Sequence, residues 1–156
     1  MSISLRPVEP GDDDFLYKVY AGTRADEMAL VPWDDAQKEA FVRMQFKAQH
    51  EHYHTHYADA DYQLILSDGR PVGRLYVHRR PDELHIIDIA LLPEHRNAGI
   101  GSALLKDLLA EAERAGIPVG IYVERFNPAQ RLYERLGFSQ VGDEGIYYRM
   151  EWRPGS

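Results

Sequence analysis

Cysteine is absent from this sequence of 156 residues. A disulfide framework, a cysteine nucleophile and a cysteine-ligated metal site are therefore excluded. No apolar run approaches the length needed to cross a bilayer, and the first residues lack the basic segment followed by an apolar segment that marks a secretory signal. These absences predict a cytoplasmic protein with no membrane partner.

Positive charge is also scarce. The 18 lysine and arginine residues are outnumbered by 25 aspartate and glutamate residues, which gives a net charge of −7. Sequence-independent nucleic-acid binding relies on basic patches, and Arg79-Arg80 is too short to form one. We therefore expect no nucleic-acid partner, whereas an acidic surface favours cationic partners such as amines.

Length and composition predict one domain spanning residues 1–156, with 44% hydrophobic and 28% charged residues. Hydrophobic periodicity and turn residues predict a mixed α/β fold with the order βααβββαβαββ. The expected strands cover residues 2–7, 61–67, 72–79, 84–91, 119–123, 138–143 and 146–152. The expected helices cover residues 12–25, 34–57 and 100–115, followed by a short helix that begins at Asn127.

Several helix ends and turns carry specific signals. Asp34 is the expected N-cap of the second helix, with Gln37 completing a capping box. Asp68-Gly69 predicts a hairpin turn, and Gly116 is expected to end the third helix.

The most informative stretch is Leu91–Leu105, where a strand runs into Pro93, a loop with two glycines and an amphipathic helix. The first turn of a helix has N–H groups without partners and a partial positive charge from the peptide dipoles. Gly99 and Gly101 remove side chains that would keep an anion away, and Arg96 adds a fixed charge. The stretch predicts a site for a ligand that carries phosphate.

Two common phosphate motifs do not fit this loop. A Walker A loop needs a lysine that is missing here, and the dinucleotide motif needs Gly or Ala where this chain has Leu104. What remains is Arg-x-x-Gly-x-Gly at Arg96–Gly101, preceded by a strand and Pro93. This pattern resembles the pyrophosphate-binding motif of the GCN5-related N-acetyltransferases. Two glycines that only cap and pack the turn are the alternative.

A second block lies downstream, from Asn127 to Phe138. Asn127 suits an N-cap, Pro128 suits the first helical position and Gly137 suits the residue after the helix. The pattern Asn-Pro-Ala-x-x-Leu-Tyr-x-x-x-Gly-Phe resembles the second motif of the same acetyltransferase family. Both blocks occur in the family's order, with one strand between them.

The resemblance implies a fold, a donor and a reaction. The fold is a mixed, mostly antiparallel sheet flanked by about four helices, with acetyl-coenzyme A held between two splayed strands. A primary amine attacks the thioester directly. The N–H near Leu91 contacts the thioester carbonyl, because Pro93 breaks the strand ladder nearby, and Leu92 lies beside the pantetheine arm. The pyrophosphate lies on the backbone of Arg96, Asn97, Ala98, Gly99, Ile100, Gly101 and Ser102.

Tyr133 corresponds to the family tyrosine near the sulfur and is the expected general acid for the departing thiolate. Packing beneath its helix is the structural alternative for this tyrosine. Asn127 is expected to reach the pantetheine amides. Many family members have this asparagine seven residues before the tyrosine, whereas here it lies six before it, so a role as helix cap stays open.

The base that accepts the amine proton is not identified by the sequence. His85 and Asp88, on the strand over residues 84–91, are the candidates. Tyr122 and Glu124 on the next strand are rivals that act directly or through water. The segment Thr23–Tyr57 is expected to wall the acceptor pocket, with Glu27 and Trp33 as substrate-binding candidates.

The expected acceptor is a small-molecule or peptide amine, no metal is expected, and a homodimer is one expected assembly. Two alternatives to the enzyme remain. One is a non-catalytic module that binds acyl-coenzyme A and reports on it. The other is a zinc hydrolase, because His50-Glu51-x-x-His54 matches the zinc-protease pattern, although the longer extension of that pattern is absent.

Overall fold

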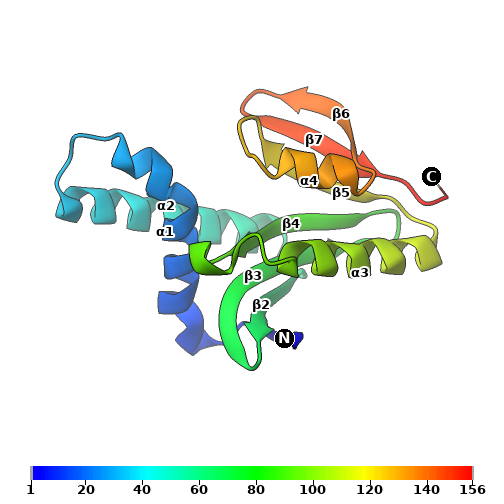
Figure 1. Ribbon diagram of the computed structural model, residues 1–156, viewed down its shortest axis with the longest axis horizontal. Coiled ribbons are helices and arrows are strands. Elements are labelled where there is room, and N and C mark those ends of the chain that lie inside the picture. Colours follow the sequence, from blue (N-terminus) through cyan, green and yellow to red (C-terminus); the bar gives the residue numbers. More distant parts are fainter. Residues whose placement is uncertain (1, 156) are drawn as a thin grey trace. The chain divides into compact units, whose positions relative to one another are not determined.

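The computed structural model describes residues 2–155, which contain seven strands and four α-helices in the predicted order (Figure 1). The strands form one open sheet with the order β1-β2-β3-β4-β5-β7-β6. The strands are β1 (Ile3–Pro7), β2 (Asp61–Ser67), β3 (Arg70–Arg79), β4 (Leu84–Leu91), β5 (Val119–Glu124), β6 (Ser139–Glu144) and β7 (Tyr147–Trp152). The helices are α1 (Asp13–Ala29), α2 (Asp35–His56), α3 (Ile100–Ala115) and α4 (Gln130–Arg135), with short 3-10 turns η1 (Pro10–Asp12) and η2 (Pro93–His95). The mixed α/β prediction is confirmed.

The chain divides into two compact units. The first unit runs up to Arg74 and also includes Ala90–Arg96, and the second unit comprises Leu75–Ile89 and the chain from Asn97 onward. Each unit buries its own apolar side chains. The first buries Leu16, Val19, Val42, Leu64, Ile65, Val72 and Leu92, and the second buries Leu75, Val77, Leu84, Ile86, Leu105, Val119, Ile121 and Met150. The single domain over residues 1–156 stays a prediction.

The first unit contains two of the predicted local signals. The Asp34 carboxylate accepts a hydrogen bond from the Gln37 N–H at 2.8 Å, and the Gln37 side chain accepts one from the Asp34 N–H at 3.1 Å. This capping box starts α2 as predicted. Between β2 and β3, Asp68 (φ 50°) and Gly69 (φ 81°) adopt the left-handed conformation of a two-residue hairpin turn, as predicted.

Helix α1 is longer than predicted. It ends at Ala29 rather than at Ala25. Residues 26–29 include neither glycine nor proline, so nothing in the chain stops the helix until it approaches Pro32.

In the second unit, β5 pairs in parallel with β4 on one side and antiparallel with β7 on the other. Strand β6 pairs antiparallel with β7, and a register shift between Gln140 and Gly142 places a bulge in β6. Helix α3 ends at Gly116 (φ 70°), as predicted, with the Ile117 N–H donating to the Ala112 carbonyl at 3.1 Å.

Among residues 2–155, none of the helices combines the length and the apolar character that a bilayer crossing requires.

Candidate active site

The start of α3 is an open helix terminus. Asn97 (φ 60°) and Gly99 (φ 83°) are both left-handed, and α3 begins at Ile100. The first backbone bond into the helix runs from the Ala103 N–H to the Gly99 carbonyl at 3.0 Å. The N–H groups of the three residues before Ala103 therefore have no partner within the helix, and no acidic side chain lies in this first turn. This terminus favours an anion.

The space that a side chain at position 101 would occupy is also empty. A Cβ atom built at Gly101 meets no atom within 4 Å, and neither does one built at Gly99. Gly99 is explained by its positive φ, but Gly101 needs no unusual backbone and fills no tight contact. Glycine at position 101 is therefore explained by something that approaches the backbone from outside the chain.

The other end of the glycine motif lies in the first unit. Leu92 is buried, and its N–H donates to the Val72 carbonyl at 2.8 Å. The Arg96 guanidinium points at backbone oxygens: Nε donates to the Leu91 carbonyl at 3.3 Å and Nη2 donates to the Gly22 carbonyl at 3.2 Å. Its positive charge therefore lies against peptide carbonyl groups of the chain.

Strands β4 and β5 are hydrogen-bonded to each other over only part of their length. Their parallel register joins Leu84 to Val119, His85 to Gly120 and Ile86 to Ile121. Strand β5 continues to Glu124 and β4 continues beyond Ile86, yet no further pair joins them within the described residues. The backbone N–H and C=O groups of the two strands beyond this point are therefore not paired with each other.

Tyr133 lies in α4 and is 5% exposed. Its ring packs edge-to-face on Phe138 with 5.6 Å between ring centroids. Burial raises the pKa of Tyr133 above its usual value, and the negative charge of Asp88 raises it further. The phenol is therefore protonated at any physiological pH, and no group within residues 2–155 forms a hydrogen bond with its hydroxyl.

His85 is also 5% exposed, but its surroundings are filled. Its ring packs edge-to-face on Tyr122 at 5.6 Å, and its Nδ1 lies 3.9 Å from Glu83. Glu83 also binds Arg80 (3.2 Å) and Arg149 (3.0 Å), so its charge is shared. Burial and these arginine charges lower the pKa of His85 to about 4.

The base candidates therefore differ in position. His85 lies in the paired part of β4 and is neutral near pH 7. Asp88 lies beyond the last pair and is close enough to Tyr133 to influence its pKa. Neither side chain is without other interactions, and the same holds for Glu124. Tyr122 is largely exposed.

The start of α4 corrects one prediction. Asn127 is not the N-cap, because α4 begins at Gln130 with Ala129 as its N-cap. The Asn127 side chain instead accepts a hydrogen bond from the Ala129 N–H at 2.9 Å, which closes a turn before the helix and delays its start. The predicted end is confirmed: Gly137 (φ 102°) donates to the Glu134 carbonyl at 3.0 Å.

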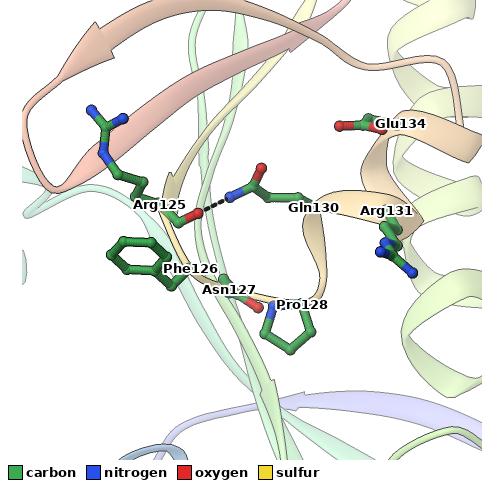
Figure 2. A pocket seen from close by; sticks show the side chains of 7 residues that line it. All are labelled: Arg125, Phe126, Asn127, Pro128, Gln130, Arg131 and Glu134. Carbon is green, nitrogen blue, oxygen red and sulfur yellow. Dashed lines mark hydrogen bonds between the residues drawn. The ribbon is translucent and has the colours of Figure 1, made fainter.

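A cavity of about 410 Å³ lies beside this turn (Figure 2). Figure 2 shows the Gln130 side chain directed back to the turn, where its Nε2 donates to the Arg125 carbonyl at 2.5 Å. The lining also includes Phe126, which is 93% exposed. Neither Phe126 nor Gln130 was predicted from the sequence to line a cavity. The sequence signal for Phe126 is an aromatic residue between Arg125 and Asn127, in a loop that is otherwise polar.

The acceptor candidates lie in the first unit. The Glu27 carboxylate accepts a hydrogen bond from Arg24 at 3.0 Å, so its charge is partly balanced. Trp33 packs edge-to-face on Phe41 with 5.3 Å between ring centroids and remains partly exposed. Each residue has a structural contact of its own.

The zinc-protease pattern lies near the end of α2. The rings of His50 and His54 are 4.3 Å apart, as their spacing on one helix face predicts. His54 also stacks on Tyr62 at 4.4 Å. Across residues 2–155, no group of three or more histidine, aspartate or glutamate side chains gathers in a way that could hold a metal ion.

A model of the acetyltransferase (GNAT) family matches residues 21–138. This match covers more than half of the sequence, and the chain belongs to the GNAT family. The family resemblance predicted from the two motifs is therefore confirmed.

Curated relatives are acetyltransferases. A ribosomal protein bS18-alanine N-acetyltransferase from Haemophilus influenzae is 34% identical over 85 residues, which are 54% of this chain and 58% of that protein. A mycothiol acetyltransferase from Actinosynnema mirum is 30% identical over 147 residues, which are 88% of this chain and 45% of that protein. The chain spans about half the length of these curated relatives.

Solved structures share the fold. The PaiA N-acetyltransferase from Thermoplasma acidophilum, in complex with coenzyme A, has a TM-score of 0.73 at 19% identity and covers 98% of this chain and 99% of that one. The ribosomal-protein-S18-alanine N-acetyltransferase from Escherichia coli has a TM-score of 0.63 at 20% identity, with 99% and 96% covered. These likenesses confirm the acetyltransferase fold.

Proposed function

We propose that this chain is an N-acetyltransferase that moves an acetyl group from acetyl-coenzyme A to a primary amine. The open start of α3 is the observation that carries the proposal. In a chain of the GNAT family, Gly101 has no structural neighbour of its own, and the N–H groups of Ile100, Gly101 and Ser102 lack helical partners. The pyrophosphate of acetyl-coenzyme A fits this terminus, because phosphate oxygens accept from such N–H groups.

The divergence of β4 and β5 supports a place for the rest of the coenzyme. The strand edges beyond Ile86 and Ile121 leave backbone groups that are not paired with each other. The pantetheine arm carries amides, and strand edges bind amides through backbone hydrogen bonds. We propose that the arm extends along these edges, with Leu91 and Leu92 near the thioester end and Asn127 near the amides.

Tyr133 is the proposed acid. The amine nitrogen forms a bond to the thioester carbon, the carbon–sulfur bond breaks, and the departing sulfur takes up a proton as the amine loses one. A protonated, buried phenol with no partner of its own supplies a hydrogen bond at the sulfur. The raised pKa of Tyr133 keeps the phenol protonated, so it stabilises the departing sulfur as a hydrogen-bond donor.

For the base, we propose Asp88 rather than His85. A histidine with a pKa of about 4 holds a proton weakly near pH 7, and its surroundings are filled. Asp88 lies beyond the last β4–β5 pair and within electrostatic reach of Tyr133. We propose Asp88 as the group that receives the amine proton, through water or directly.

The acceptor is proposed as a small-molecule or peptide amine. The relatives named above are a ribosomal protein bS18-alanine N-acetyltransferase and a mycothiol acetyltransferase, so one name refers to a protein and the other to a small molecule. Glu27 and Trp33 remain the substrate-binding proposals, since a carboxylate and an aromatic ring both attract ammonium groups.

The testing experiment follows free thiol release from acetyl-coenzyme A with a panel of amines, for the wild type, Tyr133→Phe and Gly101→Ala. Amine-dependent release that falls sharply in both variants supports the proposal. Coenzyme A binding by the wild type without release on any amine would instead favour the acyl-coenzyme A sensor. Failure of the wild type to bind coenzyme A would overturn both.

A further inference from the structure

The Arg96 side chain joins two distant backbone segments of the first unit. Its Nε donates to the carbonyl of Leu91, at the end of β4, at 3.3 Å. Its Nη2 donates to the carbonyl of Gly22, within α1, at 3.2 Å and 74 residues away in sequence. One guanidinium therefore fastens the end of a strand to the middle of a helix.

Gly22 is suited to this contact. A Cβ atom at position 22 would lie 3.1 Å from Cδ of Pro93 and 3.7 Å from Nη2 of Arg96. Glycine weakens a helix interior relative to alanine, so its presence in α1 is explained by the close approach of the Pro93 ring, with Arg96 in ordinary contact beside it. Pro93 of η2 and the Arg96 side chain pack against the surface of α1 at Gly22.

The direction of the donors matters for the charge. A guanidinium presents its N–H donors in one rigid plane, and donors of Arg96 are directed at the Leu91 and Gly22 carbonyls. A lysine in the same place could not serve both oxygens with this geometry. Position 96 therefore requires the planar set of donors of a guanidinium, in addition to a positive charge.

We propose that Arg96 is a positioning residue that clamps the start of the glycine loop to α1 through Gly22. The anion site then consists of backbone N–H groups, and the Arg96 charge serves the clamp instead of the phosphate. This assignment rests on the proposed role of the loop in binding acetyl-coenzyme A. Gly22 directly precedes Thr23, where the segment expected to wall the acceptor begins.

The test is a double-mutant cycle with Arg96→Gln, Gly22→Ala and the double variant, together with Arg96→Lys. Arg70→Gln, on an exposed residue at the start of β3, is the control for loss of one positive charge. Thermal unfolding without ligand and coenzyme A affinity by calorimetry, at two salt concentrations, are measured for each variant.

The clamp predicts that Arg96→Gln lowers Tm by about 2–4 °C, that Arg96→Lys behaves as Arg96→Gln, and that Arg96→Gln lowers Tm by less in the Gly22→Ala background than in the wild type. Coenzyme A affinity falls by the same roughly two- to fivefold in Arg96→Gln and Gly22→Ala, with an unchanged salt dependence. The Arg70→Gln control leaves Tm and affinity as in the wild type.

A direct phosphate contact predicts the opposite pattern. Arg96→Gln would weaken binding more than tenfold and reduce the salt dependence, Arg96→Lys would restore most of the affinity, and Gly22→Ala would add independently. That result, or additive changes in Tm, overturns the clamp. If the wild type binds no coenzyme A, the proposed function fails, and the unfolding cycle still decides the clamp by itself.

Discussion

Helices α3 and α4 both begin after a loop in the second unit, but their first turns are satisfied in opposite ways. At α3, Gly99 and Gly101 leave open space and the N–H groups have no acceptor within the helix. At α4, the Asn127 side chain fills the turn and the Gln130 side chain bonds back to the Arg125 carbonyl. The first start leaves N–H groups and side-chain space open, and the second is closed by the chain itself.

Two buried polar side chains repeat this contrast. The Tyr133 hydroxyl has no hydrogen-bond partner among residues 2–155, whereas His85 is enclosed by Glu83 and Tyr122. Open groups cost stability and are retained where a substrate completes them, whereas closed groups hold the fold together. Substitutions at the two kinds of group should therefore separate activity from stability.

The largest effect is expected for Tyr133→Phe, which removes an open hydroxyl. We expect kcat to fall by about 10²–10⁴ if the phenol serves the departing sulfur. Thermal stability should be unchanged or slightly higher, because no internal hydrogen bond is lost. Thiol-release kinetics and thermal unfolding measure both, with Tyr17→Phe, in α1, as the matched control. A loss of stability that parallels the loss of activity would mean that the Tyr133 hydroxyl serves the fold and not the reaction.

Gly101→Ala should have the next largest effect. A methyl group in the first turn of α3 meets nothing in the chain but blocks the approach of a phosphate. We expect the Kd for coenzyme A to rise by about 10- to 100-fold, which corresponds to roughly 1.4–2.8 kcal/mol. Stability should stay level or rise by up to about 1 kcal/mol, because alanine favours a helix.

Gly11→Ala is the matched control for Gly101→Ala, since Gly11 also has no neighbour within 4 Å and lies in η1 of the first unit. It should leave the affinity for coenzyme A unchanged. An unaltered Kd in Gly101→Ala would mean that this glycine has no ligand to accommodate.

The third effect is a pH dependence. The pKa of His85 is about 4 in the folded chain and 6.5 in its ordinary state, so the unfolded chain binds more protons between these values. Stability therefore falls as the pH drops from about 6.5 towards 4, by about 2 kcal/mol at pH 5. His85→Gln should remove this part of the pH dependence, as measured by urea unfolding at pH 7 and pH 5. If the unfolding free energy changed equally between pH 7 and pH 5 in both proteins, the low pKa of His85 in the folded chain would be contradicted.

The smallest effect is expected at the closed start of α4. Asn127→Ala removes the bond to the Ala129 N–H and should lower the free energy of unfolding by about 1 kcal/mol. Asn127→Asp keeps the accepting oxygen and should retain wild-type stability. Coenzyme A affinity of Asn127→Asp, by calorimetry, then reports on the amide alone: a weaker affinity at full stability indicates a pantetheine contact.

Local features were predicted from the sequence because their causes lie within a few residues. The Asp34–Gln37 capping box, the Asp68-Gly69 turn and the Gly116 helix end are all set by neighbours in the chain. The motif around Gly101 was likewise predictable, because its residues are neighbours in the chain. Where two local signals competed, at Asn127, the turn formed by the asparagine side chain delayed the helix.

Features that depend on distant residues were not predicted. The place where β4 and β5 separate, after Ile86, depends on the pairing of strands that are far apart in sequence. The contact of Arg96 with Gly22 spans 74 residues, and no periodicity or spacing encodes it. The low pKa of His85 arises from burial and from arginines on other segments. These long-range contacts decide which candidate residues are open and which are closed.

The bulge in β6 has a consequence for self-association. Strand β6 ends the sheet order, so its outer backbone groups offer a template on which another strand could add. The register shift between Gln140 and Gly142 interrupts that template, and Asp143 and Glu144 place negative charges beside it. A continuous intermolecular ladder of hydrogen bonds along this edge would require the bulge to be straightened. The bulge therefore disfavours the regular addition of strands along this edge.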